Sequence, residues 1–324
     1  MAELRWNPLI KDWVMIASHR QNRPQMPKDW CPFCPGSGKV PDHFDVLKYD
    51  NDFPALSPNP PEPDDVATEL YKVKPSHGKC EVILYSPEHT VTLPELSVPH
   101  VRKLVDLWTE RYTELKKDPE NKYIFIIENR GAVVGVTMPH PHGQIYAYPF
   151  VPKRLELELA ASKEHFEQTG RCLLCDMLHD EVEAGSRIII ENDDFYAFLP
   201  FYSEYPYGMY IISKAHKHSL EEFNDREKDN LAKIVRETAG TLDSLFDYAF
   251  PYMMCMYQSP VNVEEDTPYY HFHIKFFPPM RSAEKQKFNA SSETGAWAHC
   301  NPTAPEEKAE ELRAAYKKFI QKGE

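Results

Sequence analysis

Two histidines separated by a single proline are the clearest candidates for chemistry in this sequence. His140 and His142 lie in the segment 139–144 (PHPHGQ). The flanking prolines enforce an extended path, so both imidazoles should point to the same side of the chain. A neutral imidazole, with a pKa of about 6.5, is a good nucleophile at neutral pH. Its attack on phosphorus would give a phosphoramidate that can pass its group on, which is covalent ping-pong catalysis.

The residues of this segment should have different roles. We expect His140 to bind a metal ion and so to fix the backbone that aims His142, the predicted nucleophile. Gly143 lets another group approach closely. Gln144 offers amide N–H donors that can hold a phosphate oxygen without adding a charge or a base. The sequence therefore predicts His142 and Gln144 as catalytic residues, although a His-x-His pair alone also fits two exposed polar positions of a strand.

Four of the seven cysteines form two Cys-x-x-Cys pairs. An odd number of cysteines in a long, apparently intracellular chain argues against a disulfide framework and indicates metal or redox chemistry. Two thiolates and two imidazoles make a tetrahedral Zn²⁺ site. The first predicted zinc site comprises Cys31, Cys34, His89 and His140. The alternative is a redox pair or two buried thiols, but Pro35 and Gly36 follow where a redox pair would usually open a helix.

The two halves of the chain repeat the same order of features. Each has a Cys-x-x-Cys pair, a strand leading to a histidine, a helix, a further strand and a His-x-His pair. The repeat predicts two copies of one α+β unit, residues 1–152 and 153–324. Only the first copy should be reactive, because His273 is followed by Ile274-Lys275 where the first half has Gly143-Gln144.

A second Zn²⁺ site follows from the repeat. Its predicted ligands are Cys172, Cys175, His216 and His271. A closed site of four protein ligands contributes folding energy rather than chemistry. His218 could replace His216, since a shift of two residues keeps the same strand face. The alternative is a set of core thiols and surface histidines.

Strand-like and helical patterns alternate between these motifs. The predicted strands are 81–85, 123–127, 144–150, 187–190, 209–212, 252–257 and 269–277. Helical spacing of apolar residues predicts helices over 101–115 and 231–245, and a third that begins near Thr303 with a capping-box pattern. Because strand-to-strand steps are common, the fold class should be α+β with a largely antiparallel sheet.

Composition excludes several classes of protein. The 324-residue chain has a formal net charge of −13 and no basic patch, so nucleic acid is an unexpected partner. The N-terminus lacks the apolar region of a signal peptide, and no run of about 18 apolar residues would span a membrane. We therefore expect a cytoplasmic protein, in which a few local groups can still hold a small phosphorylated ligand.

Longer motifs link the sequence to a known family. They are 5–9 (RWNPL), 18–24 (SHRQNRP), 51–56 (NDFPAL), 128–131 (ENRG), 140–144 (HPHGQ), and 271–273 (HFH) followed by Pro278-Pro279. With these motifs the chain resembles the galactose-1-phosphate uridylyltransferases of the histidine-triad superfamily. The resemblance implies two fused histidine-triad units, the second structural and sugar-binding, in a homodimer. It also implies transfer of UMP from UDP-glucose to galactose 1-phosphate through a uridylyl-histidine.

The resemblance further implies a substrate site at matching positions. Asn51 and Asp52 should face the uracil and ribose. The phosphates should be surrounded by Arg20, Arg23, Asn129, Gly135, Thr137 and Gln144. Lys287, Phe288 and Glu293 should approach the sugar from the partner subunit, although the segment 289–302 departs from the family pattern. Without the resemblance, the arginines would be solvated surface charges and Asn51 a turn residue.

Some members of this family bind a second metal ion through a different set of ligands. The matching positions here are Glu158, Gln258, His271 and His273. Because Gln258 stands in place of a histidine, we prefer the set that contains Cys172 and Cys175.

Three other functions compete with the transferase. A phosphorylase of the same superfamily, acting on ADP-glucose or a dinucleoside polyphosphate, would use the same His142. Hydrolases of the histidine-triad type carry a third histidine where this chain has Gln144. An amide there removes an acid/base partner and should let the covalent intermediate survive until an acceptor arrives. A zinc-stapled binding module without catalysis is the third alternative.

Overall fold

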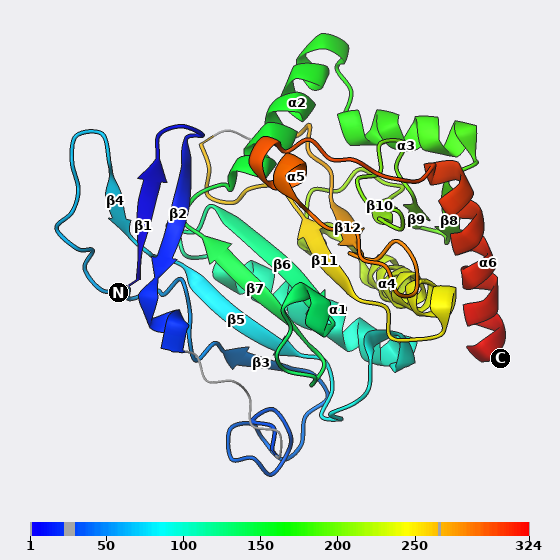
Figure 1. The fold of residues 1–324 in the computed structure, drawn as a ribbon, viewed down its shortest axis with the longest axis horizontal. Coiled ribbons are helices and arrows are strands. Elements are labelled where there is room, and N and C mark those ends of the chain that lie inside the picture. Colours follow the sequence, from blue (N-terminus) through cyan, green and yellow to red (C-terminus); the bar gives the residue numbers. More distant parts are fainter. Residues whose placement is uncertain (1, 23–29, 265–266, 324) are drawn as a thin grey trace.

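The computed structural model describes residues 2–22, 30–264 and 267–323 (Figure 1). The strands are β1 (Ala2–Asn7), β2 (Asp12–Ala17), β3 (Leu47–Asp50), β4 (Val73–Pro75), β5 (Lys79–Leu84), β6 (Tyr123–Arg130), β7 (His142–Tyr148), β8 (Ile188–Glu191), β9 (Phe195–Phe198), β10 (Tyr210–Ser213), β11 (Tyr252–Tyr257) and β12 (His273–Phe277). The α-helices are α1 (Val98–Leu115), α2 (Lys153–Thr169), α3 (Leu173–Ala184), α4 (Asp225–Phe246), α5 (Ser291–Ala296) and α6 (Pro305–Gly323). Short 3-10 helices are η1 (Ser18–Asn22), η2 (Leu93–Glu95), η3 (Ala132–Val134) and η4 (Leu220–Glu222).

The strands form a small sheet and a large one. The small sheet has the order β2-β1-β4, and the large one the order β3-β5-β7-β6-β11-β12-β10-β9-β8. Every ladder between the described strands is antiparallel. The predicted α+β class with a largely antiparallel sheet is therefore confirmed.

The large sheet is continuous across both halves of the chain. Strands β6 and β11, where the two halves of the chain meet, pair from Arg130 opposite Tyr252 to Ile126 opposite Met256. On either side of this pair the order is mirrored, because β7 and β5 flank β6 as β12 and β10 flank β11. His142 begins β7 and His273 begins β12, so the two His-x-His motifs enter the sheet at corresponding places. The division into units 1–152 and 153–324 stays a prediction.

Different layers cover the two faces of the large sheet. Helices α1, α4 and α6 share one apolar core with one face of the strands, through residues such as Trp108, Leu231 and Leu312. On the other face, α2 and α3 pack over the second half through Leu155 and Leu178. The small sheet packs over β5 and β7 through a cluster that includes Leu4. Figure 1 shows α1 and α4 behind the strands, with the small sheet at one edge.

The alternation of side chains along β7 places the predicted catalytic residues on one face of the sheet. Along β7, every second side chain is fully buried and the others are half-buried. Ile145 and Ala147 point into the helical core. Because neighbours on a strand face opposite sides, His142, Gln144 and Tyr146 share the other face.

The predicted helices lie close to the observed ones. Helix α4 begins where the Asn224 side chain accepts the Glu227 N–H at 3.0 Å and Glu227 accepts the Asn224 N–H at 2.9 Å, which is a capping box. The sequence prediction missed α2 and α3, in part because α2 buries only Leu155 and Ser162 and so lacks a clear apolar stripe. The last predicted strand was too long, since β12 begins at His273.

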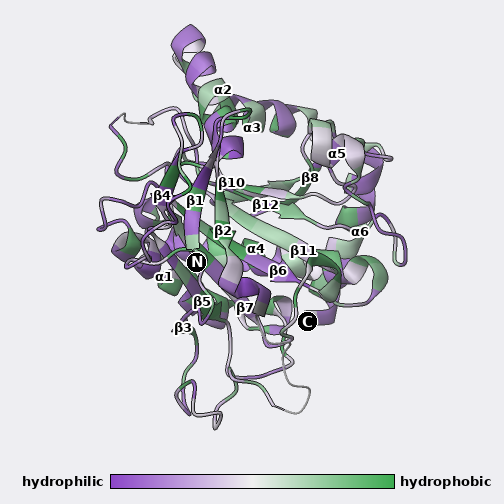
Figure 2. Cartoon of the chain, turned by 60° about the vertical axis from the view of Figure 1, so that its left-hand side comes forward, coloured by the Kyte–Doolittle hydropathy of each residue, from purple (hydrophilic) through white to green (hydrophobic). Residues whose placement is uncertain are grey.

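Hydropathy follows these layers. Figure 2 shows hydrophobic residues concentrated in the strands of the large sheet and hydrophilic residues at the outer end of α2. Among the described residues, no helix has both the length and the apolar character needed to cross a bilayer.

Candidate functional site

The backbone of the preceding histidine orients the ring of His142. The His142 Nδ1–H donates to the His140 carbonyl oxygen at 2.8 Å, which fixes the tautomer and places the lone pair on Nε2. The side chain is half-buried, and its ring centroid lies 6.1 Å from that of Phe33 in an edge-on arrangement. His142 therefore has the form that a nucleophile at phosphorus requires.

The strand is packed closely beneath this histidine. A Cβ atom at Gly143 would lie 2.4 Å from the Tyr85 hydroxyl oxygen and 2.8 Å from the Ile127 carbonyl oxygen. Tyr85 also donates its backbone N–H to the Pro141 carbonyl at 3.0 Å. The close approach expected at Gly143 is confirmed, and the approaching group is Tyr85, on the core side of His142.

A cavity of about 310 Å³ lies beside His142. The end of β6 and the loop after it contribute most of its lining, together with the His-x-His segment. Its lining includes Glu128, Asn129, Arg130, Gly131, Thr137, His140 and His142. The structure thus brings Asn129 and Thr137, two predicted phosphate contacts, to the same cavity as His142. Gly135, a third, lies in the same loop and ends η3 with a left-handed φ of 85°.

An ion pair anchors the start of this loop. The Arg130 guanidinium donates two hydrogen bonds to the Asp243 carboxylate, at 2.9 and 2.8 Å. Asp243, on α4, also accepts the Phe250 N–H at 2.9 Å. Such a bidentate pair fixes the geometry of both partners, so the end of β6 is tied to the helical layer.

A buried carboxyl group lies at the edge of the same cavity. Glu128 is 5% exposed, and its Oε1 accepts the Tyr252 hydroxyl at 3.1 Å. Burial raises the pKa of Glu128 to about 7, against an opposing effect of Arg130. Glu128 is therefore protonated in the folded state over a pH range in which an unfolded glutamate is ionised.

This raised pKa predicts a pH-dependent effect of Glu128→Gln. The folded state holds a proton that the unfolded state has lost, so stability falls as pH rises from about 4.5 through about 7. Above pH 7 the buried carboxylate costs on the order of 3 kcal/mol, and glutamine removes that cost while keeping an acceptor for Tyr252. We expect the stability gained by Glu128→Gln in urea unfolding to be larger at about pH 8.5 than at about pH 5.5.

The matched control for this experiment is Glu110→Gln, at a carboxylate that is 72% exposed. Its effect on stability should be small at both pH values. A gain at Glu128 that does not change with pH would contradict the raised pKa.

Arg20 approaches the predicted catalytic strand through a tyrosine. Its Nη1 lies 3.5 Å from the Tyr146 hydroxyl, which in turn donates to Gln144 Oε1 at 3.4 Å. The structure thus links Arg20 and Gln144, both predicted to contact phosphate. Arg23 lies outside the described residues.

The predicted base and ribose contacts lie in the turn after β3. The Asn51 side chain accepts the Phe53 N–H at 2.9 Å, as a turn residue does. Asp52 is exposed, and both of its carboxylate oxygens lie 3.0 Å from the Tyr49 hydroxyl.

The three predicted sugar contacts lie outside the lining of the His142 cavity. Lys287 is buried, with its Nζ 3.4 Å from Glu293 Oε1 and 5.2 Å from the centroid of the Tyr205 ring. Phe288 is 68% exposed. Lys287 and Glu293 thus form a small cluster beside Tyr205.

The four predicted ligands of the first metal site converge. One ligand atom from each of Cys31, Cys34, His89 and His140 lies within 4.8 Å of the others. Cys34 Sγ is 3.3 Å from His89 Nδ1 and 3.6 Å from His140 Nδ1. His140 donates its Nε2–H to the Ser86 carbonyl at 2.8 Å, which leaves Nδ1 as the ligand atom. Burial lowers the pKa of His140 to about 4, so the ring is in the neutral form that binds metals.

The second predicted set converges in the same way. One ligand atom from each of Cys172, Cys175, His216 and His271 lies within 4.8 Å of the others. His271 Nε2 is 2.8 Å from the Ser213 hydroxyl, and His140 Nε2 is 2.8 Å from the Ser86 carbonyl oxygen. His218 does not replace His216 in this cluster; its Nε2 lies 2.9 Å from the far nitrogen of the His216 ring. Both clusters can hold a metal ion.

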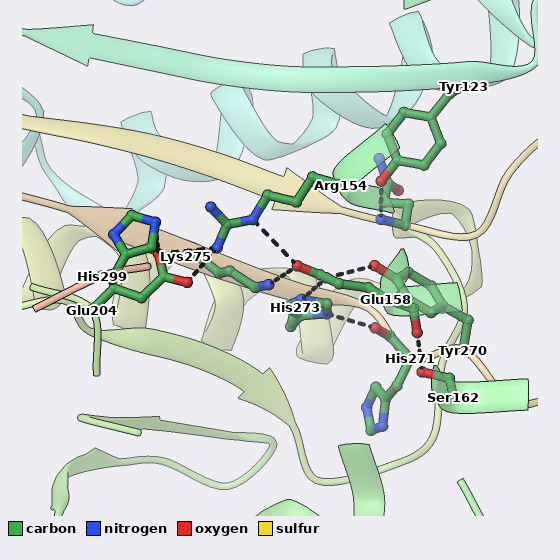
Figure 3. A network of polar contacts seen from close by, with 11 residues as sticks. Tyr123, Arg154, Glu158, Ser162, Glu204, Tyr270, His271, His273, Lys275 and His299 are labelled. Carbon is green, nitrogen blue, oxygen red and sulfur yellow. Dashed lines mark hydrogen bonds and ion pairs between the residues drawn. The ribbon is translucent and has the colours of Figure 1, made fainter. Parts of the chain in front are cut away.

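The other set of metal ligands does not converge. His271 Nδ1 lies 3.3 Å from Cys175 Sγ. The Gln258 Oε1 accepts the Leu220 N–H at 2.8 Å. Glu158 accepts a hydrogen bond from Lys275 at 2.5 Å (Figure 3). These positions therefore do not form the second metal site that was the alternative from the family resemblance.

Several residues of the site were not predicted from the sequence. Glu128 and Arg130 belong to the ENRG motif, but only Asn129 was assigned. Tyr146 could have been found from strand periodicity, since it lies two residues after Gln144 on the same face. Nothing local in the sequence indicates that Asp243 would reach Arg130.

Comparisons with known proteins agree with this geometry. The family model "Galactose-1-phosphate uridyl transferase, N-terminal domain" matches residues 1–152, and the C-terminal domain model matches residues 158–321. Galactose-1-phosphate uridylyltransferase of Thermotoga maritima is 41% identical to this chain, and the match covers 97% of the chain and 98% of the relative.

Solved structures show the same relationship. One described as uridylyltransferase has a TM-score of 0.90 and 33% identity, covering 98% of this chain and 99% of that one. An ADP-glucose phosphorylase from Arabidopsis thaliana with bound ADP-glucose has a TM-score of 0.74 and 25% identity, covering 97% and 98%. The two domain matches and the identity over nearly the whole length show that the chain belongs to the galactose-1-phosphate uridylyltransferase family.

Proposed function

We propose that this enzyme transfers UMP from UDP-glucose to galactose 1-phosphate through a covalent intermediate on His142. The observation that carries the proposal is the hydrogen bond from His142 Nδ1 to the His140 carbonyl, beside the cavity lined by Asn129 and Thr137. It directs a basic Nε2 to one defined side of the strand. Family membership supports both the substrates and the ping-pong order.

In the first half-reaction, His142 Nε2 attacks the α-phosphorus of UDP-glucose. An N–P bond forms, and the bond between phosphorus and the bridging oxygen breaks, so that glucose 1-phosphate leaves with the electron pair. The ring gains positive charge, which the Nδ1–H shares with the His140 carbonyl. Asn129, Gly135, Thr137 and Arg20 are proposed to hold the phosphate oxygens, with Arg23 and Gln144.

In the second half-reaction, a phosphate oxygen of galactose 1-phosphate attacks the same phosphorus. The N–P bond breaks, UDP-galactose forms, and His142 returns to its neutral form without net uptake of a proton. Gln144 can donate hydrogen bonds to the phosphoryl group, but at neutral pH it cannot act as a base toward water. The uridylyl-histidine intermediate can therefore persist until a sugar phosphate binds.

Mass spectrometry tests the proposal directly. Protein mixed with UDP-glucose alone should carry a uridylyl group, and digestion should locate it on the peptide that contains His142. Adding galactose 1-phosphate should remove the adduct and release UDP-galactose. A protein that converts both substrates without an adduct on His142 would refute the mechanism.

Gln144→His should shift the enzyme toward hydrolysis. The new imidazole would be an acid/base group next to the intermediate, and such groups contribute roughly 100-fold or more to proton transfer. We expect the ratio of UDP-glucose hydrolysis to transfer to rise at least about tenfold, measured from the release of UMP and UDP-galactose. Gln144→Asn, which keeps an amide, is the control; an equal ratio in both variants would exclude this role.

The main alternative is a phosphorylase, because the structure is also similar to that of an ADP-glucose phosphorylase. Labelled UDP-glucose and galactose 1-phosphate separate the two reactions. Exchange of label into glucose 1-phosphate supports the transferase. Phosphate-dependent release of ADP from ADP-glucose, without that exchange, would support the phosphorylase.

We propose Zn²⁺ as the ion of both clusters. The support is the donor set, since two cysteine sulfurs and two Nδ1 atoms suit a closed tetrahedral zinc site. Bound zinc would supply folding energy rather than chemistry. In the first cluster it would also hold His140, whose carbonyl orients His142.

We propose a homodimer in which Lys287, Phe288 and Glu293 of one subunit reach the sugar in the other subunit's site. Support comes from their position outside the His142 cavity of their own chain. We also propose a cytoplasmic enzyme with two units, 1–152 and 153–324, the second structural and sugar-binding; the mirrored strand order supports the division.

A further inference from the structure

Three polar groups in the second half of the chain, two of them buried and one half-buried, have no part in the reaction at His142 (Figure 3). They are Glu158 on α2 and His273 and Lys275 on β12, and they line a cavity of about 310 Å³. Lys275 Nζ donates to Glu158 Oε1 at 2.5 Å, and His273 Nε2 lies 3.8 Å from Glu158 Oε2. The side chains of His273 and Lys275 are 1% and 5% exposed. The charge of Lys275 must therefore be balanced within the protein.

His273 has the local geometry of His142 in a different environment. Its Nδ1–H donates to the His271 carbonyl at 2.9 Å, as that of His142 does to the His140 carbonyl. The lone pair is again on Nε2, which has no hydrogen-bond partner among the described residues. Its ring stacks on Tyr257, with centroids 4.8 Å apart and planes at 8°. Here the imidazole presents its lone pair to a carboxylate instead of an open cavity.

A carboxylate oxygen and an imidazole nitrogen at this separation are typical ligands of a divalent cation. Zinc binds such atoms at about 2.0–2.2 Å, which allows two donors to lie up to about 4 Å apart. Without a cation, two electron-pair donors facing each other in a buried site are unfavourable. A positive charge nearby is therefore needed to stabilise the pair formed by Glu158 and His273.

Lys275 supplies that charge. It lies two residues after His273, on the same strand face, and its Nζ is 4.2 Å from the Tyr257 ring centroid and 5.2 Å from that of Tyr210. Aromatic faces stabilise a desolvated ammonium group. Arg154, one turn before Glu158 on α2, places its Nε 3.7 Å from the same carboxylate. Two cations thus already face one carboxylate, and a metal ion would be repelled by both.

We infer that the Lys275 ammonium, bound to Glu158, supplies the positive charge that a divalent metal ion would bring to Glu158 and His273, and so keeps this cavity free of metal in the native protein. The inference goes beyond the proposed function, because the group lies outside the His142 cavity. It also accounts for the absence of Glu158 and His273 from the clusters of described residues that could hold a metal ion.

The wild-type protein provides the first test. Metal per chain, measured by elemental mass spectrometry, should be the same in wild type and Glu158→Gln. All cobalt(II) bound to the wild-type protein should show thiolate-to-cobalt charge-transfer absorption, as expected for the two cysteine clusters. A metal equivalent that Glu158→Gln removes would overturn the inference.

Replacing the lysine provides the second test. Lys275→His should bind one additional equivalent of cobalt(II) without added thiolate charge transfer, and the gain should disappear in Lys275→His/Glu158→Gln. Lys214→His, at an exposed lysine directly after β10, should gain none. A Lys275→His protein with native circular dichroism and unchanged metal content would contradict the inference. If Lys275→His does not fold, the comparison of metal content between wild type and Glu158→Gln still tests the inference. Neither measurement depends on whether an adduct forms at His142.

Discussion

Replacing His142 by alanine should lower the kcat for uridylyl transfer by roughly 10⁴- to 10⁶-fold, the range seen when a covalent nucleophile is removed. Alanine removes the only atom to which the UMP group is proposed to bind, so no adduct should form with UDP-glucose. The fold should survive, because His142 is half-buried and at the start of β7, and His140 keeps its place in the first cluster. Steady-state kinetics, adduct mass spectrometry and metal content together test this result.

The chain offers a matched control for this variant. His273 has the same hydrogen bond to the carbonyl two residues before it, at 2.9 Å against 2.8 Å for His142. His273→Gln should leave kcat within about twofold of wild type if the second copy has no chemistry, although loss of the stacked ring should reduce stability. A His142→Ala protein that still transfers UMP would refute the nucleophile. A wild-type protein without activity toward nucleotide sugars would favour the alternative of a zinc-stapled binding module without catalysis.

Removing a ligand of the first cluster should have the second largest effect. Cys34→Ala should lose about one metal equivalent, because three remaining ligands no longer close a tetrahedral site. Structural zinc contributes about 10–16 kcal/mol in small zinc peptides, so a loss of several kcal/mol and a fall in Tm on the order of 10 °C are expected. Activity should fall as well, because the cluster holds His140, whose carbonyl orients His142.

Two other cysteine variants separate these effects. Cys300→Ser changes an exposed cysteine outside both clusters and should alter neither metal content nor Tm. Cys175→Ala should lose metal and stability but retain more kcat than Cys34→Ala, since the second cluster holds His271 and not His140. The assignment fails if Cys34→Ala keeps its full metal content, or if the two cluster variants lose activity equally.

The two clusters of cysteines and histidines could be predicted from sequence because the chemistry of such sites is strict. Few arrangements other than a metal site bring two Cys-x-x-Cys pairs together with histidines at repeated positions, and the structure gathers all eight residues as expected. The tautomer of His142 also follows from local geometry, because the carbonyl that accepts its proton lies two residues away.

The tertiary contacts of the site could not be predicted in this way. Strand periodicity shows that Lys275 shares a face with His273, but it does not show that α2 crosses that face with Glu158. The α2 segment lacks a strong apolar stripe, so the helix itself was missed. Arg130 and Asp243 are 113 residues apart, and no local pattern connects them. Propensity and spacing describe neighbours along the chain, whereas these pairs depend on how layers are stacked.

The hydrogen-bonded join between β6 and β11 has a consequence for how this protein can evolve. β6 ends in Asn129 and Arg130, and its other edge holds β7 with His142. A mutation that loosens β11 therefore also loosens a strand of the half that contains His142, even though β11 carries no proposed chemistry. Natural selection can thus preserve a half of the chain to which no reaction is assigned, because the half with His142 is built onto it.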